Sequence, residues 1–137
     1  MDNKVDYWLE LCDEDLITAK GLFDLKRFLH MGFFCHLIAE KALKAAIAHE
    51  GGFPPKIHDL KKLSKLSSVA ADLSEEQLDL LEQLNPLNIE ARYPKYKMEI
   101  AETLSLSKCK EILSKTEAFL CWIKERLGMS CKIIPKK

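Results

Sequence analysis

One stretch of this chain is apolar at almost every position, and it limits what the chain can fold into. Within residues 33–47, with alanine and cysteine counted as apolar, the exceptions are His36, Glu40, Lys41 and Lys44. A helix that is apolar on most of its circumference needs cover from more than one side. The stretch therefore predicts a helix packed among several others. We expect a second copy of the chain, in a homodimer with this helix near the seam, to complete its cover.

Helical periodicity dominates the rest of the sequence, which has no alternating run typical of a β-strand. The Ser-x-x-Gln sequence at 74–77 has the form of a capping box, which marks a helix start. Helices are predicted over residues 3–25, 29–50, 58–66, 74–84 and 105–127, with a loop over 88–96. The predicted fold class is all-α: an antiparallel up-and-down bundle of three long and two short helices over residues 1–128, followed by a flexible tail over 129–137.

The overall composition argues against several classes of function. The 21 basic and 21 acidic residues balance, so no global attraction to nucleic acid or to an anionic membrane is indicated. No apolar run approaches the length of a membrane span, and the acidic start is unlike a signal peptide, so we expect a cytoplasmic protein with no membrane contact. The five cysteines contain no C-x-x-C pair, and neither a metal nor a cofactor is predicted.

The polar exceptions within the apolar stretch follow a helical spacing. His36, Glu40 and Lys44 lie at i, i+4 and i+8, which places them on one stripe, with Lys41 beside it. One interpretation is a solvent-exposed strip in which the Glu–Lys pair contributes about 0.2–0.5 kcal/mol. The other is a polar groove, inside or beside a dimer interface, that holds an anionic ligand.

Two further segments carry candidate functional side chains. The loop at 88–96 contains Arg92 and Tyr93; an arginine fork suits phosphate or carboxylate, and a tyrosine ring can stack on a base. The alternative is a structural latch, in which Arg92 pairs with an acid and Tyr93 packs into the bundle. His58 and Asp59 stand at a predicted helix start, where they can cap the helix, bind an anion or transfer a proton.

Three segments, in this order, resemble the HEPN family, whose name stands for a nucleotide-binding domain of higher eukaryotes and prokaryotes. They are the second-helix sequence FCHLIAEKALKA at 34–45, the link PPKIHDL at 54–60 and the loop NIEARYP at 88–94. The resemblance implies a dimeric helical bundle that binds a nucleotide or polynucleotide and acts beside a minimal nucleotidyltransferase, often as a toxin–antitoxin pair. The expected ligand-binding residues are Arg92 and Lys44 as anion contacts, Tyr93 for stacking, His58 as a donor, and Glu40, Lys41 and His36 to complete the site.

Other branches of that family are metal-independent ribonucleases with an R-x(4–6)-H motif. This sequence departs from the motif, because Arg27 is followed by His30 and His36 at other spacings and no histidine follows Arg92 or Arg126. No catalytic residue is therefore expected. A ribonuclease toxin with an atypical Arg/His site is the alternative hypothesis, and a purely structural oligomerisation module is the third.

Overall fold

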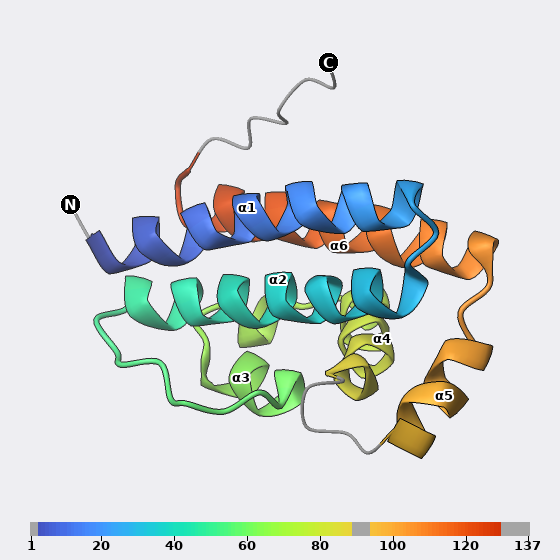
Figure 1. Ribbon diagram of the computed structural model, residues 1–137. Coiled ribbons are helices and arrows are strands. Elements are labelled where there is room, and N and C mark those ends of the chain that lie inside the picture. Colours follow the sequence, from blue (N-terminus) through green and yellow to red (C-terminus); the bar gives the residue numbers. More distant parts are fainter. Residues whose placement is uncertain (1–2, 89–93, 130–137) are drawn as a thin grey trace.

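Six α-helices and two short 3₁₀ helices make up the part of the chain that the computed structural model describes, residues 3–88 and 94–129 (Figure 1). No strand occurs within these two ranges. The helices are α1 (Asn3–Asp24), α2 (Phe28–His49), α3 (Leu60–Leu66), η1 (Ala70–Asp72), α4 (Glu75–Leu84), η2 (Asn85–Leu87), α5 (Pro94–Glu102) and α6 (Leu106–Arg126).

The helix ends follow local sequence signals. Ser74 accepts a hydrogen bond from the backbone of Gln77, and the Gln77 side chain accepts one from the backbone of Ser74, so the predicted capping box is confirmed. Ser105 caps α6 in the same way through the backbone of Lys108. Beyond the end of α2, Gly51 has a φ of +87°, a conformation that glycine adopts without steric cost.

One helix begins inside a segment that the sequence pattern predicts as a loop. The predicted loop over 88–96 is wrong at its end, because α5 begins at Pro94. Proline suits the first position of a helix for two reasons. Its fixed φ is helical, and the backbone N–H that it lacks would have no acceptor within the helix at that position. Residues 89–93, with Arg92 and Tyr93, lie outside the described ranges, and so does the predicted tail from residue 130 onward.

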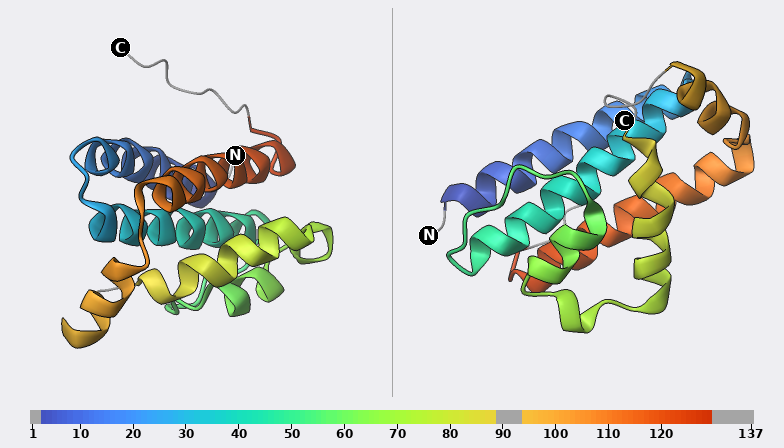
Figure 2. Two further views of the ribbon diagram at one scale, coloured as in Figure 1. Left: turned by 90° about the vertical axis from the view of Figure 1, so that its right-hand side faces the viewer. Right: turned by 90° about the horizontal axis from the view of Figure 1, so that it is seen from below.

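The helices are arranged around α2, and the all-α prediction is confirmed. α1 and α2 are antiparallel neighbours, and α6 lies along both of them and runs in the direction of α2 (Figure 1). The shorter α3 and α4 pack on the other side of α2 (Figure 2). The chain then continues through α5 into α6. None of the helices in the described ranges has the length and hydropathy needed to cross a bilayer.

The apolar helix predicted from the sequence is α2, and a single subunit covers most of it. α1 and α6 contact it on one side, and α3, α4, η2 and α5 contact it elsewhere. Residues 42–48 of α2 are all buried. The short helices thus supply much of the cover that the sequence predicts, while Phe33, Phe34 and Leu37 stay half-buried in one subunit. The homodimer stays a prediction.

Candidate functional site at the junction of α2 and α3

A buried carboxylate is the centre of the polar stripe on α2. Glu40 Oε2 accepts a hydrogen bond from Lys44 Nζ at 3.0 Å, one turn further along the helix. Glu40 Oε1 lies 3.0 Å from His58 Nδ1, in the segment between α2 and α3. The side chains of Glu40 and Lys44 are each less than one-tenth exposed. The solvent-strip interpretation is therefore wrong, although the Glu–Lys pair that it contains is present.

His36 lies beneath this pair and holds the segment that carries His58. The His36 side chain is fully buried, and its Nε2 lies 3.0 Å from the backbone oxygen of His58. Because a carbonyl oxygen can only accept, His36 Nε2 carries the proton and donates it. His36 Nδ1 lies 3.7 Å from Glu40 Oε1. His36 and Glu40 together fix both the backbone and the ring of His58.

The tautomer of His58 follows from the same reasoning. A carboxylate accepts hydrogen bonds and does not donate them, so His58 Nδ1 carries the proton shared with Glu40. In the neutral ring, Nε2 then has a free lone pair. The His58 side chain is 62% exposed, whereas that of Glu40 is 6% exposed. A buried acid thus orients an accessible imidazole, which can accept a proton from a ligand or, once protonated, donate to one.

Asp59 begins α3 and is tied to η2. Its Oδ1 accepts hydrogen bonds from the backbone N–H groups of Lys61 and Lys62, which makes it the N-cap of α3. The same oxygen accepts from Asn85 Nδ2 at 3.1 Å, and Asn85 Oδ1 accepts from the backbone of Leu60 at 2.9 Å. The hydrogen bond from Asn85 is the main reason that the pKa of Asp59 lies below its ordinary value, with the two backbone bonds adding to it.

We expect Asn85→Ala to destabilise the chain by about 1–2 kcal/mol at pH 7, because it removes both amide hydrogen bonds. A carboxyl group with a lowered pKa in the folded state adds stability above its unfolded pKa and loses that contribution as the pH falls. The difference between wild type and variant should therefore shrink below about pH 4. Urea unfolding at pH 7 and pH 3 measures it. Asn88→Ala is the control, and an equal loss at both pH values would contradict the role of Asp59.

A cleft of about 370 Å³ opens beside the exposed face of His58. It is lined by His58, Asp59, Asn85, Pro86 and Asn88, so the imidazole shares it with two amide side chains. Among the residues that the structure describes, no group of three or more histidine, cysteine or acidic side chains is placed to hold a metal ion. The groups present suit hydrogen bonds to a polar or anionic ligand.

The structure brings some of the predicted site residues together and separates others. His36, Glu40, Lys44 and His58 form one cluster. Lys41 is not part of it, because Lys41 Nζ pairs with Asp15 of α1 at 2.6 Å, which ties α1 to α2. Within the cluster, Lys44 is neutralised by Glu40 and nearly buried. The contacts made by Lys44 and His36 fit a positioning role better than direct contact with a ligand.

Asn85 and Trp8 are the site residues that sequence reasoning missed. Asn85 stands before Pro86, directly after the helix predicted over 74–84. No sequence signal pairs its amide with Asp59, because the two residues belong to different helices and meet only through packing. The ring centroid of Trp8, on α1, lies 5.6 Å from Lys44 Nζ. Its position follows from the packing of α1 on α2, and spacing alone does not predict it.

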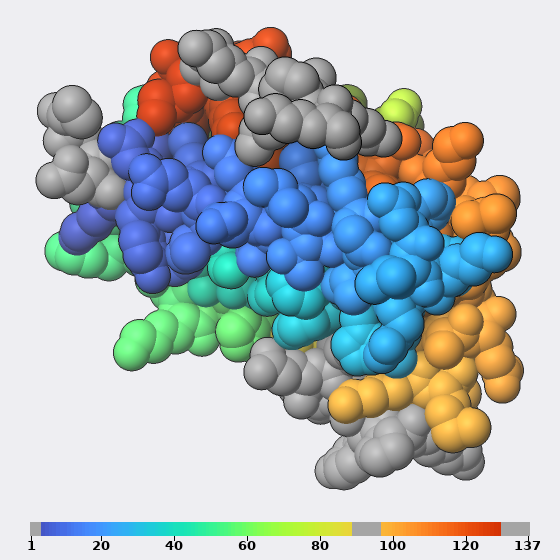
Figure 3. Space-filling view, turned by 45° about the horizontal axis from the view of Figure 1, so that its top comes forward, coloured from blue at the N-terminus to red at the C-terminus, as the bar shows by residue number. Residues whose placement is uncertain are grey.

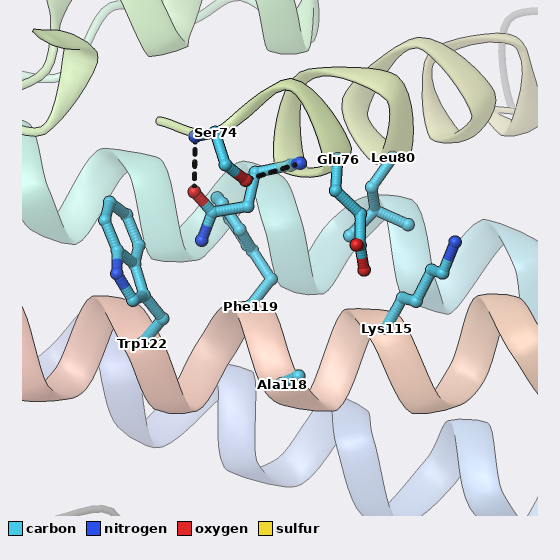
Figure 4. A pocket seen from close by; sticks show the side chains of 8 residues that line it. Ser74, Glu76, Leu80, Lys115, Ala118, Phe119 and Trp122 are labelled. Carbon is cyan, nitrogen blue, oxygen red and sulfur yellow. Dashed lines mark hydrogen bonds between the residues drawn. The ribbon is translucent and has the colours of Figure 1, made fainter. Parts of the chain in front are cut away.

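A second cleft lies between α4 and α6 and has a different character (Figure 4). Phe119 and Trp122 form an aromatic wall on α6, with ring centroids 6.2 Å apart. On the α4 side, Gln77 is engaged in the capping box with Ser74. Glu76 and Lys115 also line this cleft, but among the described residues no buried partner orients either of them as Glu40 orients His58.

The fold and the cluster define a small all-α domain with a polar site where its second and third helices meet. The sequence profile of the HEPN domain family matches residues 5–127, which is most of the chain. The chain therefore belongs to the HEPN domain family. This membership supports a function connected with nucleotides or RNA in general.

A solved structure shares the fold of this chain. The crystal structure of TT1696 from Thermus thermophilus is similar to this chain with a TM-score of 0.78, covering 92% of this chain and 99% of that chain. The sequences are 22% identical, so the likeness concerns the fold alone. No curated protein sequence matches this chain.

Proposed function

We propose that this HEPN domain is a cytoplasmic, non-catalytic subunit that binds a nucleotide or polynucleotide at the cleft beside His58. The observation that carries the proposal is the Glu40–His58 pair, because a buried carboxylate holds an exposed ring in one orientation at a cleft. In its protonated form the ring presents Nε2–H to the cleft while Nδ1–H stays on Glu40, and a charged N–H donor is a good partner for a phosphate oxygen. Arg92 and Tyr93 retain their proposed roles as an anion contact and a stacking residue.

The basic residues around His58 favour an anionic ligand. Lys56 and Lys62 are exposed, and neither forms an ion pair within 4.0 Å in the described ranges, although the charge of Lys62 acts on the nearby Asp59 carboxyl. By contrast, Lys61 pairs with Glu82 at 3.0 Å. In a chain with no net charge, such a local excess of positive charge is what an anionic ligand requires.

His58→Ala is expected to weaken nucleotide or oligoribonucleotide binding at least tenfold, which corresponds to about 1.4 kcal/mol. The reason is the loss of the oriented imidazole from the cleft. Fluorescence anisotropy with a labelled oligoribonucleotide measures the affinity. His30→Ala is the matched control, because His30 is an exposed histidine at the far end of α2. An unchanged affinity of His58→Ala would reject the site.

We further propose that the chain acts with a minimal nucleotidyltransferase in a toxin–antitoxin-like pair. Family resemblance supports this partner. Co-expression of the tagged chain with a nucleotidyltransferase encoded beside it should yield a complex that survives gel filtration. Purification of both proteins as separate species would count against the pairing.

The homodimer also remains part of the proposal. Most of α2 is buried within one subunit, and its half-buried Phe33, Phe34 and Leu37 are available to a second copy. Sedimentation equilibrium across micromolar concentrations should give twice the 15.7 kDa mass of the chain. A monomer mass throughout that range would remove the dimer from the account.

Metal-independent ribonuclease activity is the alternative function, and one observation favours it. An exposed imidazole whose other nitrogen is held by a buried carboxylate is suited to general acid–base catalysis. Such catalysis also requires an arginine that holds the phosphate. Arg126, in the described part of the chain, is instead paired with Asp72. Cleavage of RNA in the presence of a chelator, abolished in His58→Ala, would support this alternative. Intact RNA after prolonged incubation would reject it.

A further inference from the structure

Among the residues whose side chains the structure describes, the two most exposed aromatic rings lie near each other. Phe53 is 82% exposed and Tyr7 is 57% exposed; the other strongly exposed large apolar side chains are aliphatic or methionine. Lys4 contacts the ring of Phe53 and neighbours Tyr7 along α1. Its Nζ lies 4.1 Å from the centroid of the Phe53 ring, and it precedes Tyr7 by three residues on the same face of α1. Figure 3 shows the first turns of α1 beside the green segment that follows α2.

These four residues, Lys4, Tyr7, Trp8 and Phe53, are called the aromatic surface. A chain of side-chain contacts links this surface to the Glu40 cluster. The rings of Tyr7 and Trp8 meet edge to face at 5.3 Å. Trp8 in turn lies 5.6 Å from Lys44 Nζ, and Lys44 donates to Glu40. Through Glu40 the contacts reach His58.

The same chain segment carries Phe53 and His58. Four residues lie between them, so their Cα atoms are five steps and at most about 18 Å apart even if the segment is fully extended. Phe53 is preceded by Gly51 and Gly52 and followed by Pro54 and Pro55. The two prolines stiffen the segment that joins the aromatic surface to the site.

We propose that the aromatic surface stacks the bases of a single-stranded polynucleotide while His58 contacts its backbone. The inference rests on the proposed function, and it names the ligand class as a strand rather than a mononucleotide. Exposed rings beside a cation are the elements with which proteins hold single strands without reading sequence, since every base has a face that can stack. Aromatic rings also occur at protein interfaces, and the test below therefore includes a protein partner among its outcomes.

The test compares a mononucleotide, uridine monophosphate, with a uridine hexanucleotide. Both bind through His58, but only the hexanucleotide reaches the aromatic surface. Phe53→Ala and Tyr7→Ala should each weaken hexanucleotide binding by at least about fivefold and leave mononucleotide binding unchanged. Tyr7→Phe keeps the ring and should keep the affinity. Leu66→Ala is the control, because it removes an exposed apolar side chain elsewhere, on α3.

Trp8 supplies an independent readout. In a Trp122→Phe background Trp8 is the remaining tryptophan, and stacking of bases nearby should quench its fluorescence on addition of the hexanucleotide. Circular dichroism melting of each variant confirms that the bundle is folded.

The outcomes separate this inference from the proposed function. Loss of hexanucleotide binding in His58→Ala but not in Phe53→Ala or Tyr7→Ala would overturn the aromatic surface alone. Absence of binding by the wild-type chain, or binding indifferent to all three variants, would overturn both proposals. If Phe53→Ala and Tyr7→Ala disrupt a complex with a nucleotidyltransferase and leave hexanucleotide binding intact, the surface is a protein contact and the inference is wrong.

Discussion

Replacement of Glu40 by glutamine is expected to lower the free energy of unfolding by about 3 kcal/mol, because it leaves the Lys44 ammonium buried without its counter-charge. The side chains of Glu40 and Lys44 are both nearly inaccessible, so water cannot replace the lost carboxylate. Glutamine keeps one acceptor oxygen in place of two, so the separate hydrogen bonds to Lys44 and His58 can no longer both be made in the same way. Urea unfolding followed by circular dichroism gives the free energy directly.

Two companion variants identify the cause of that loss. Glu82→Gln breaks the exposed Lys61–Glu82 pair, which has the same 3.0 Å separation, and should change stability by less than about 1 kcal/mol. Adding Lys44→Met to Glu40→Gln removes the orphaned charge and should recover much of the stability. Equal effects of Glu40→Gln and Glu82→Gln would show that the burial of the pair has no energetic consequence.

Leu81→Ala is expected to destabilise the bundle by about 3 kcal/mol, through the lost burial of its side chain and the cavity left behind. Leu81 is fully buried on α4, which packs against both α2 and α6. Leu78 lies on the same helix but is 42% exposed, so Leu78→Ala should cost less than about 1 kcal/mol. Urea unfolding of the two variants measures the contrast, and similar losses for both would mean that α4 is not firmly docked.

The long helices could be predicted from the sequence because their apolar residues repeat with helical period. α5 could not be predicted in this way, because it is short and polar. Among its residues whose side chains are described, Ile100 is the buried apolar one, and a single position gives no repeat. The pattern around α2 showed that the helix needs cover on several sides. It did not show that helices as short as α3 supply that cover, because the number of neighbours depends on tertiary packing.

The candidate site likewise combines residues that the sequence pattern predicts with contacts that it does not. The stripe of His36, Glu40 and Lys44 follows from helical spacing, and the capping role of Asp59 follows from its place at a helix start. The bond between Glu40 and His58 joins residues 18 apart in the chain, and it depends on the path of the segment between α2 and α3. Periodicity carries no information about that path. Lys41 shows the converse, because spacing placed it beside the stripe, yet it reaches Asp15 on α1.

The central claim is that Glu40 holds His58 with Nδ1 protonated, so that Nε2 faces the ligand. Long-range ¹H–¹⁵N NMR of the imidazole rings measures the tautomer directly at about pH 8.5, well above the ordinary pKa of histidine. At that pH we expect a protonated Nδ1 and a bare Nε2 for His58. At about pH 5.5, where an ordinary imidazole is protonated at both nitrogens, Nε2–H can donate to a phosphate, and uridine monophosphate should shift Nε2 more than Nδ1. A His58 ring protonated at Nε2 at the higher pH, or an Nε2 signal that ignores the nucleotide at the lower pH, would contradict the account.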